Sequence, residues 1–347
     1  MRVGIFGKAG SGKSTLFRSL AGGADAVPAA GKAAGMCTIK VPDDRVDRLA
    51  ALFRPRKTTH IAITFVEIDP GGTELLATET LTSIKSVDVL GLVLRGFSDD
   101  FHPAPPEGLD PVKEFRSVES ELVLADYVVA QKRIERMTKE ARRGPEWTAL
   151  HKAVALLETE APLRRLALAG DDARALAGFR FVSQLPLLLV LNVGEGDLAG
   201  EPYPELTGVA ADRGVPLIRL SARIEEEIAQ LSPAEQADFL KAMGIVEGAR
   251  DRLVRGAFDA MDYICFMTVG EDEVRAWNVR RGTTAVSAAG KIHSDLEKGF
   301  IRAEVIECEE LLRCGSLAKA KAEGTLRLEG KEYVVRDGDI LHVRFNV

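Results

Sequence analysis

The chain has 347 residues, and 46 lysines and arginines against 52 aspartates and glutamates give it a formal net charge of −6. Hydrophobic residues make up 46% and charged residues 28%, as in an ordinary globular protein, which excludes global disorder and fibrous repeats. The length suggests about two to three domains. The longest apolar run, Leu185 to Leu191, is far shorter than the roughly 20 residues of a membrane span, so we expect no membrane partner.

Short apolar runs alternate with helix-like stretches over the first 97 residues, which predicts βαβ units around a parallel sheet. A Pro-rich stretch without periodicity follows over residues 98–108 and predicts a loop. The expected elements before this loop are strands at 2–6, 62–68 and 87–94 and a helix at 14–21.

Two helical patterns follow the loop. Apolar residues recur at helical spacing from about 111 to 142, where Arg143-Gly144-Pro145 ends the pattern, and again over 147–161, where Pro162 ends it. The short connection predicts an antiparallel helical hairpin, an arm over about 111–168. After a helix near 172–178, strand patterns return at 187–191 and 215–220, so the arm is an insertion within one α/β domain.

A separate, mainly β module is expected at the C-terminus, after a helical connector over 233–263. We therefore predict a nucleotide-binding domain over 1–262 and a second domain over 263–347. The expected strands of this module are 264–269, 274–279, 333–335 and 340–345.

The segment Gly7 to Thr15 fits the phosphate-loop pattern G-x-x-x-x-G-K-[ST] and lies between an expected buried strand and an expected helix. In such a loop, backbone N–H groups surround the phosphates, Lys13 reaches the β and γ phosphates, and the Ser14 hydroxyl ligates Mg²⁺. The expected nucleotide-binding residues here are Gly10, Ser11, Gly12, Lys13, Ser14 and Thr15.

The base of the nucleotide is expected near the end of the strand at 187–191, where Asn192-Val193-Gly194-Glu195 lacks the Lys and Asp of the guanine signature N-K-x-D. ATP, or relaxed selectivity, is therefore favoured over GTP. Ser221-Ala222, after the next strand, fits a companion loop on the base side. The alternative is that Asn192 only satisfies loop backbone groups and that Glu195 is solvated.

In the order of its motifs, the whole chain resembles the YchF or Obg-like ATPase family. This resemblance implies an ATP-binding, Mg²⁺-dependent protein with a coiled-coil arm, a C-terminal TGS module of β-grasp fold, and association with the ribosome. The segments that carry the resemblance are Gly12-Lys13-Ser14-Thr15-Leu16-Phe17, Cys37-Thr38-Ile39, Glu121 to Asp126, Asn192-Val193-Gly194-Glu195, Glu273 to Trp277 and, most specifically, Ala289 to Glu304.

The chain departs from the family in its second phosphate motif, D-I-A-G-L. Aligned by the strand, Glu67 takes the Asp position, and Pro70, which has no N–H, takes the Gly position. A shift of two residues instead gives Asp69-Pro70-Gly71-Gly72, which restores D-x-x-G and the N–H of Gly72. Both frames stay open, and neither contains a Gln that would orient water.

The first switch is also altered, because Gly35 to Pro42 replaces the family's P-F-C-T-I-E-P-N. Thr38 matches the family residue and is expected to be a second hydroxyl ligand of Mg²⁺ beside Ser14, or else an ordinary strand residue. His102 lies roughly where the family has a histidine near the nucleotide. The weak catalytic candidates are thus Asp69, Gly72 and His102, and the shortened switches favour slow hydrolysis.

Charged clusters add one candidate surface. Basic residues near the tip of the arm could meet rRNA, or could pair with nearby acids such as Glu135 and Glu140. The acidic cluster Glu225-Glu226-Glu227 is expected to be a solvated helix face. The basic residues are Lys132, Arg133, Arg136, Lys139, Arg142 and Arg143.

These patterns together predict a doubly wound, mostly parallel P-loop sheet with an inserted helical arm and a C-terminal β-grasp domain. The expected function is slow, Mg²⁺-dependent conversion of ATP and water to ADP and phosphate by a cytoplasmic, ribosome-associated switch. A nucleotide-gated docking protein with negligible hydrolysis, or a GTPase, is the alternative. Four cysteines without a C-x-x-C pair agree with a reducing compartment and give no zinc site.

Overall fold

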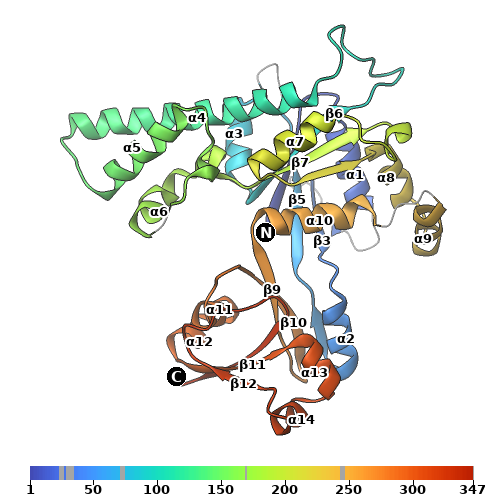
Figure 1. The fold of residues 1–347 in the computed structure, drawn as a ribbon, viewed down its shortest axis with the longest axis vertical. Helices are drawn as coiled ribbons and strands as arrows, with labels where there is room; N and C mark the ends of the chain where they lie inside the picture. The colour runs from blue at the N-terminus through green and yellow to red at the C-terminus, as the bar shows by residue number, and fades with distance from the viewer. Residues whose placement is uncertain (23–26, 29–34, 71–74, 169, 243–246, 347) are drawn as a thin grey trace. The chain divides into compact units, whose positions relative to one another are not determined.

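A computed structural model describes residues 1–22, 27–28, 35–70, 75–168, 170–242 and 247–346 (Figure 1). Contacts within the chain divide it into two compact units. The first contains Met1–Ile39 and Thr64–Ala260, and the second contains Lys40–Ile63 and Met261–Val347. The expected domain boundary at residue 262 assigned residues 40–63 to the nucleotide-binding domain, whereas these contacts group them with the C-terminal residues.

The first unit is built on a seven-stranded sheet. Its central strands run parallel, from β5 through β1, β6 and β7 to β8, whereas β2 and β3 pair antiparallel at one edge. The order across the sheet is β2 (Val27–Pro28), β3 (Met36–Lys40), β5 (Ala62–Glu67), β1 (Arg2–Phe6), β6 (Val89–Gly96), β7 (Leu187–Val193) and β8 (Leu217–Leu220).

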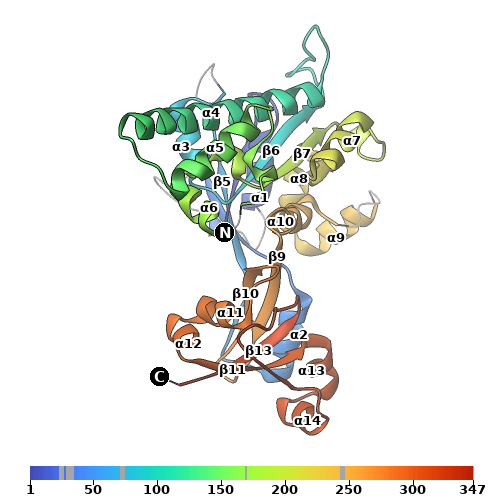
Figure 2. The same cartoon turned by 60° about the vertical axis from the view of Figure 1, so that its left-hand side comes forward.

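Helices cover both faces of this sheet (Figures 1 and 2), which is why β1, β6 and β7 are almost continuously apolar and buried. The doubly wound α/β class expected from the sequence is confirmed. The helices of this unit outside the arm are α1 (Lys13–Gly22), α3 (Thr78–Lys85), α7 (Pro204–Arg213), α8 (Ala222–Ala229), α9 (Pro233–Ala242) and α10 (Ala249–Ala260), with short 3-10 turns at Ala177–Phe179 and Glu195–Asp197.

The arm is a helical hairpin of α4 (Pro111–Lys139) and α5 (Pro145–Leu157), and Figure 2 shows the two helices side by side. The second helix ends at Leu157, four residues before the expected end at 161, and Pro162 precedes a 3-10 turn at Leu163–Arg165. The first half of α4 packs on the sheet core, and its second half packs on α5 in a separate apolar cluster that also includes Leu176 of α6 (Gly170–Leu176).

The second unit contains a six-stranded mixed sheet whose core is the expected β-grasp module. The expected strand at 333–335 is wrong, because only an isolated bridge joins Thr284 to Val334. Across the sheet the order is β12 (Arg327–Glu329), β11 (Phe300–Glu307), β13 (Asp339–Phe345), β9 (Tyr263–Thr268), β10 (Glu273–Arg280) and β4 (Lys57–Thr59); the helices are α2 (Asp44–Phe53), α11 (Ala285–Ile292), α12 (Ser294–Lys298), α13 (Cys308–Cys314) and α14 (Leu317–Ala322).

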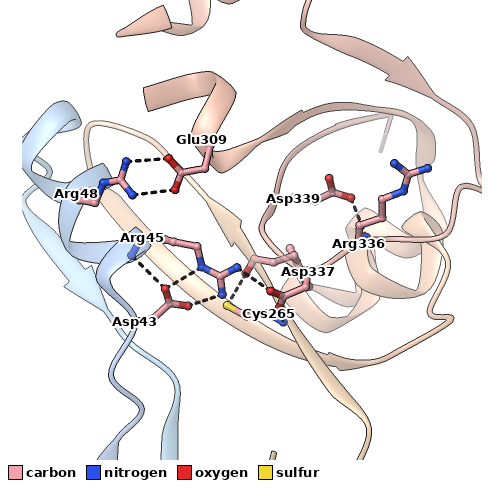
Figure 3. Close-up of polar contacts among 9 residues, drawn as sticks. Asp43, Arg45, Arg48, Cys265, Glu309, Arg336, Asp337 and Asp339 are labelled. Atoms are coloured by element: carbon pink, nitrogen blue, oxygen red, sulfur yellow. Dashed lines mark hydrogen bonds and ion pairs between the residues drawn. The ribbon is translucent and has the colours of Figure 1, made fainter. Parts of the chain in front are cut away.

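Residues 40–63 belong to this second sheet through both backbone and side chains. Strand β4 pairs parallel with β10, and α2 packs against β10 and α13. Figure 3 shows Arg45 of α2 held bidentate by Asp43 at 2.9 and 2.8 Å and by Asp337 at 2.7 Å. Arg48 makes a second bidentate pair with Glu309, with both bonds at 2.8 Å. These charge-assisted bonds fix the orientation of α2 in the module.

One buried carboxylate ties the arm to the first unit. Asp126 of α4 accepts backbone N–H bonds from Val182 at 2.9 Å and Ser183 at 2.7 Å, in the 3-10 turn Val182–Gln184. Burial raises the pKa of Asp126 from 3.8 to about 6, although these bonds favour the carboxylate. A carboxyl group with a higher pKa in the folded chain binds more protons when folded, so it lowers the free energy of unfolding as pH rises from about 4 to about 6.

Replacing Asp126 with Asn removes this proton uptake. We expect the difference in unfolding free energy between the unaltered chain and Asp126→Asn to change with pH between about 4 and 6 and to be constant above about pH 7. Urea unfolding at several pH values measures it. A difference that does not vary with pH across that range would contradict the raised pKa.

Candidate nucleotide site

A cavity of about 600 Å³ opens at the carboxyl ends of the parallel strands of the first unit, the usual place for ligands in such sheets. The expected nucleotide-binding residues meet here, except that Ser11 is buried behind the cavity wall. The lining residues are Gly10, Gly12, Lys13, Ser14, Thr15, Phe97, Ser98, Asp99, His102, Asn192, Val193, Gly194, Glu195, Ser221, Ala222, Arg223 and Glu226.

The phosphate loop joins β1 to α1 and passes very close to the neighbouring strands. A β-carbon at Gly7 would lie 2.5 Å from the carbonyl oxygen of Val93 in β6. A β-carbon at Gly12 would collide with the side-chain amide of Asn192, and the φ of Gly12, +88°, also favours glycine. These two glycines therefore allow the loop to lie against the sheet with its backbone turned toward the cavity.

Asn192, at the end of β7, joins the phosphate loop to the loop on the base side. Its Nδ2 donates to the carbonyl oxygen of Ser11 at 2.9 Å, and its Oδ1 accepts from the N–H of Ala222 at 2.8 Å. Asn192 is only 4% exposed, so both bonds are shielded from water. Asn192 thus satisfies loop backbone groups and lines the cavity, and its expected place near the base of a nucleotide stays a prediction.

Two carboxylates from the end of β5 contact the polar groups of the phosphate loop. The Ser14 hydroxyl donates to Glu67 Oε1 at 2.5 Å, and Lys13 Nζ lies 3.4 Å from Asp69 Oδ1. Glu67 is the residue that takes the Asp position in the strand-aligned frame of the second phosphate motif. Gly72, which the shifted frame requires, lies outside the described residues.

The hydroxyl of Ser14 and the carboxylate of Glu67 form an oxygen pair, the ligand type that Mg²⁺ prefers. Among the described residues no group of three or more His, Cys, Asp or Glu side chains could hold a metal ion alone. Mg²⁺ in proteins usually keeps several waters and is bound by one or two protein oxygens together with substrate phosphates. Ser14 and Glu67 fit this mode of binding. Thr38 lies on β3, outside the cavity lining, and its hydroxyl contacts that of Thr64 at 3.1 Å.

The loop after β6 brings His102 over the phosphate loop. A β-carbon at Gly10 would lie 3.8 Å from His102 Cδ2. Arg95 holds this loop by donating to the carbonyl oxygens of Phe97, at 3.1 Å, and of His102 and Pro103. The Nδ1 of His102 lies 3.2 Å from Asp99 Oδ1, so the carboxylate orients the ring at the edge of the cavity.

Two charged residues of α8 that the sequence did not assign to the site also line the cavity. Glu226 lines it and pairs with Arg18 of α1, with Nε to Oε1 at 2.6 Å, and Arg223 lines it as well. The expectation of a solvated Glu225 to Glu227 face is wrong for Glu225, which is 8% exposed, whereas Glu226 is partly exposed and Glu227 is exposed.

Most basic residues near the arm tip have partners. Arg133 pairs with Glu146 at 2.7 Å, and Arg136 pairs with Glu140 at 2.8 Å. Arg142 lies 3.8 Å from Glu140, and the guanidinium of Arg143 stacks 3.7 Å from the centre of the Trp147 ring. Lys132 and Lys139 are exposed and make no ion pair within the described residues. Near the arm tip these two lysines are thus free to meet an external anion.

Comparison with known proteins matches the chain over its whole length. It is 36% identical over 364 residues to the ribosome-binding ATPase YchF of Bacillus subtilis (strain 168), covering 100% of both chains. It is 33% identical over 366 residues to the ribosome-binding ATPase YchF of Escherichia coli O157:H7, covering 100% of this chain and 99% of the relative. The family model YchF-GTPase_C, described as a protein of unknown function, matches residues 263–346.

A solved structure has the same fold. The structure of the Schizosaccharomyces pombe YchF GTPase superposes with a TM-score of 0.85 at 27% identity, over 99% of this chain and 97% of that one. None of the described helices in the present chain is long and apolar enough to cross a membrane.

Changing Asn192 to Asp tests its bridging role. The carboxylate still accepts from Ala222, but it has no N–H for the carbonyl oxygen of Ser11 and repels it. We expect a loss of about 1–3 kcal/mol in unfolding free energy and weaker nucleotide binding. Thermal unfolding and calorimetric titration measure the two effects, and Asn278→Asp on the half-exposed surface of β10 is the control. Equal effects of the two substitutions would contradict the role.

Proposed function

This chain belongs to the YchF family, and we propose that it is a Mg²⁺-dependent ATPase that hydrolyses ATP slowly and acts as a ribosome-associated nucleotide switch. The observation that carries the nucleotide part is the meeting of the phosphate loop, Asn192 and the loop at Ser221 and Ala222 around one cavity. The ribosomal part is supported by the names of the bacterial relatives, and with it we propose a cytoplasmic location.

The proposed chemistry is positioning and charge neutralisation. Backbone N–H groups of the phosphate loop and the ammonium of Lys13 bind the β and γ phosphates. Ser14 would ligate Mg²⁺, and Glu67 would orient that hydroxyl and the waters around the ion. Bound Mg²⁺ supplies further neutralisation of the phosphate charge. Thr38 is proposed as a second hydroxyl ligand, which requires its hydroxyl to leave the contact with the hydroxyl of Thr64.

Slow turnover is supported by what lines the cavity. No glutamine is present among the described lining residues, and His102 is already engaged by Asp99. Asp69 pairs with Lys13 in the absence of nucleotide and is not among the residues that line the cavity. The same observation favours the second candidate function, a nucleotide-gated docking protein with negligible hydrolysis. Gly72 stays a candidate outside the described residues.

The preference for ATP over GTP is supported by Glu195, which lines the cavity where the guanine signature has Asp. A glutamate is longer by one methylene, so its oxygens do not reach the guanine N1 and N2 groups in the same geometry. The fission yeast structure is described as a GTPase, and the bacterial relatives as ATPases. A direct comparison of the two nucleotides is therefore the first experiment.

Titration calorimetry with ATP and GTP, with and without Mg²⁺, makes that comparison. We expect tighter binding of ATP, and we expect Lys13→Ala to weaken it about 10- to 100-fold, because charge-assisted bonds to the phosphates are lost. Lys8→Ala, in the same loop but outside the cavity lining, is the matched control. Markedly tighter GTP binding would revive the GTPase alternative, and single-turnover phosphate release separates slow hydrolysis from none.

Lys132 and Lys139 give a test of the proposed contact with rRNA. Changing both to Glu reverses the charge at two exposed positions near the arm tip and leaves the ion pairs of Arg133 and Arg136 in place. We expect co-sedimentation with ribosomes to weaken about tenfold or more at low salt, because each phosphate contact adds to the salt-dependent affinity. Lys241→Glu with Lys321→Glu, exposed lysines outside the arm, is the charge-matched control. An equal loss in the control would assign the effect to net charge alone.

A further inference from the structure

The ammonium group of Lys13 already has a counter-ion from its own chain. Asp69 Oδ1 lies 3.4 Å from Lys13 Nζ, and within the described residues no other carboxylate is paired with it. The Lys13 side chain is 11% exposed, whereas that of Asp69 is 76% exposed. A nearly buried ammonium is costly without a neighbouring negative charge, so Asp69 supplies what the loop needs before any nucleotide arrives.

The two carboxylates after β5 are held differently. Glu67 is the last residue of β5, where it pairs in register with Ile5 of β1, and its backbone N–H donates to Gly35 at 2.8 Å. Asp69 follows the end of the strand and turns an exposed carboxylate toward the loop. Glu67 is therefore fixed by the sheet, and Asp69 is the partner that can leave.

A triphosphate and Asp69 compete for the same positive charge. The β and γ phosphates of a bound nucleotide would approach Lys13 from the cavity, and their charge repels a carboxylate held against the same ammonium. We propose that Asp69 is the internal counter-ion of Lys13 in the nucleotide-free protein and that the phosphates of the nucleotide displace it. This proposal rests on the proposed nucleotide site.

Displacement of Asp69 would couple nucleotide binding to the position of the chain segment after β5. Asp69 leaves its only ion-pair partner among the described residues when the phosphates take Lys13, so the backbone at Asp69 and Pro70 loses one of its anchors to the phosphate loop. Loss of the nucleotide restores the contact. The position of this segment then reports whether the site is loaded, which is the physical requirement for a switch.

The expected size of the effect follows from the exposure of Asp69. Ion pairs with an exposed partner contribute about 0.2–1 kcal/mol, which corresponds to about a 1.4- to fivefold change in an equilibrium constant. Removing the carboxylate should therefore strengthen nucleotide binding by up to about fivefold. It should also destabilise the nucleotide-free protein slightly, because Lys13 then lacks its counter-ion.

The test compares Asp69→Asn with the unaltered full chain. A non-hydrolysable ATP analogue is titrated by calorimetry in excess EDTA, so that neither turnover nor Mg²⁺ binding contributes. We expect about two- to fivefold tighter binding and a melting temperature of the nucleotide-free protein lower by about one to three degrees. Opposite signs in the two measurements are the signature of an internal counter-ion.

Asp100→Asn is the matched control, because Asp100 is an exposed aspartate next in the chain to a lining residue but neither lines the cavity nor pairs with Lys13. An equal gain in Asp100→Asn, or unchanged or weaker binding in Asp69→Asn, would overturn the proposal. Binding of the analogue by the unaltered chain with no gain in Asp69→Asn leaves the proposed function standing and removes this inference alone. Failure of the unaltered chain to bind removes both.

Discussion

The nucleotide site depends on one buried amide. Asn192 spans the space between Ser11 of the phosphate loop and Ala222 of the base-side loop, and both of its bonds are within 2.9 Å. The loop can reach this amide only because Gly12 has no side chain. Leaving one of these buried groups without its partner would cost about 1–3 kcal/mol, out of a typical unfolding free energy of about 5–15 kcal/mol. The site is therefore assembled by the fold before a ligand enters it.

The buried carboxylates of the arm have partners within the first unit. Glu119 of α4 is 3% exposed and accepts from both Arg164 and Arg213, which fixes the root of the arm to the rest of the first unit. Asp126 does the same through backbone N–H groups. Lys132 and Lys139 of α4 are exposed and make no ion pair in the part of the chain that the structure describes. The buried charges of the arm are thus structural, and its free charges face solvent.

The sequence predicts the structural features that depend on a short segment alone. Strand β1 matches its expected bounds, Arg2–Phe6, because an apolar run before a glycine-rich loop has one interpretation. The contact of Glu67 with Ser14 could not be predicted, since it depends on the register of β5 beside β1. The partners of Arg133 and Arg143 depend on how α5 returns along α4. Residues 333–335 form only the single bridge between Val334 and Thr284, so β-branched residues alone do not produce a strand.

The course of residues 40–63 has a consequence for the order of synthesis. The chain leaves the first sheet after β3, contributes α2 and β4 to the second sheet, and returns as β5. The partners of α2, strand β10 and helix α13, are among the last residues made. During translation Val46 and Leu49, which end fully buried, lack β10 and α13 as packing partners of their helix until most of the chain has been made. A prematurely terminated product therefore carries an uncovered amphipathic helix near its beginning, and chaperones and proteases can distinguish it from the complete protein.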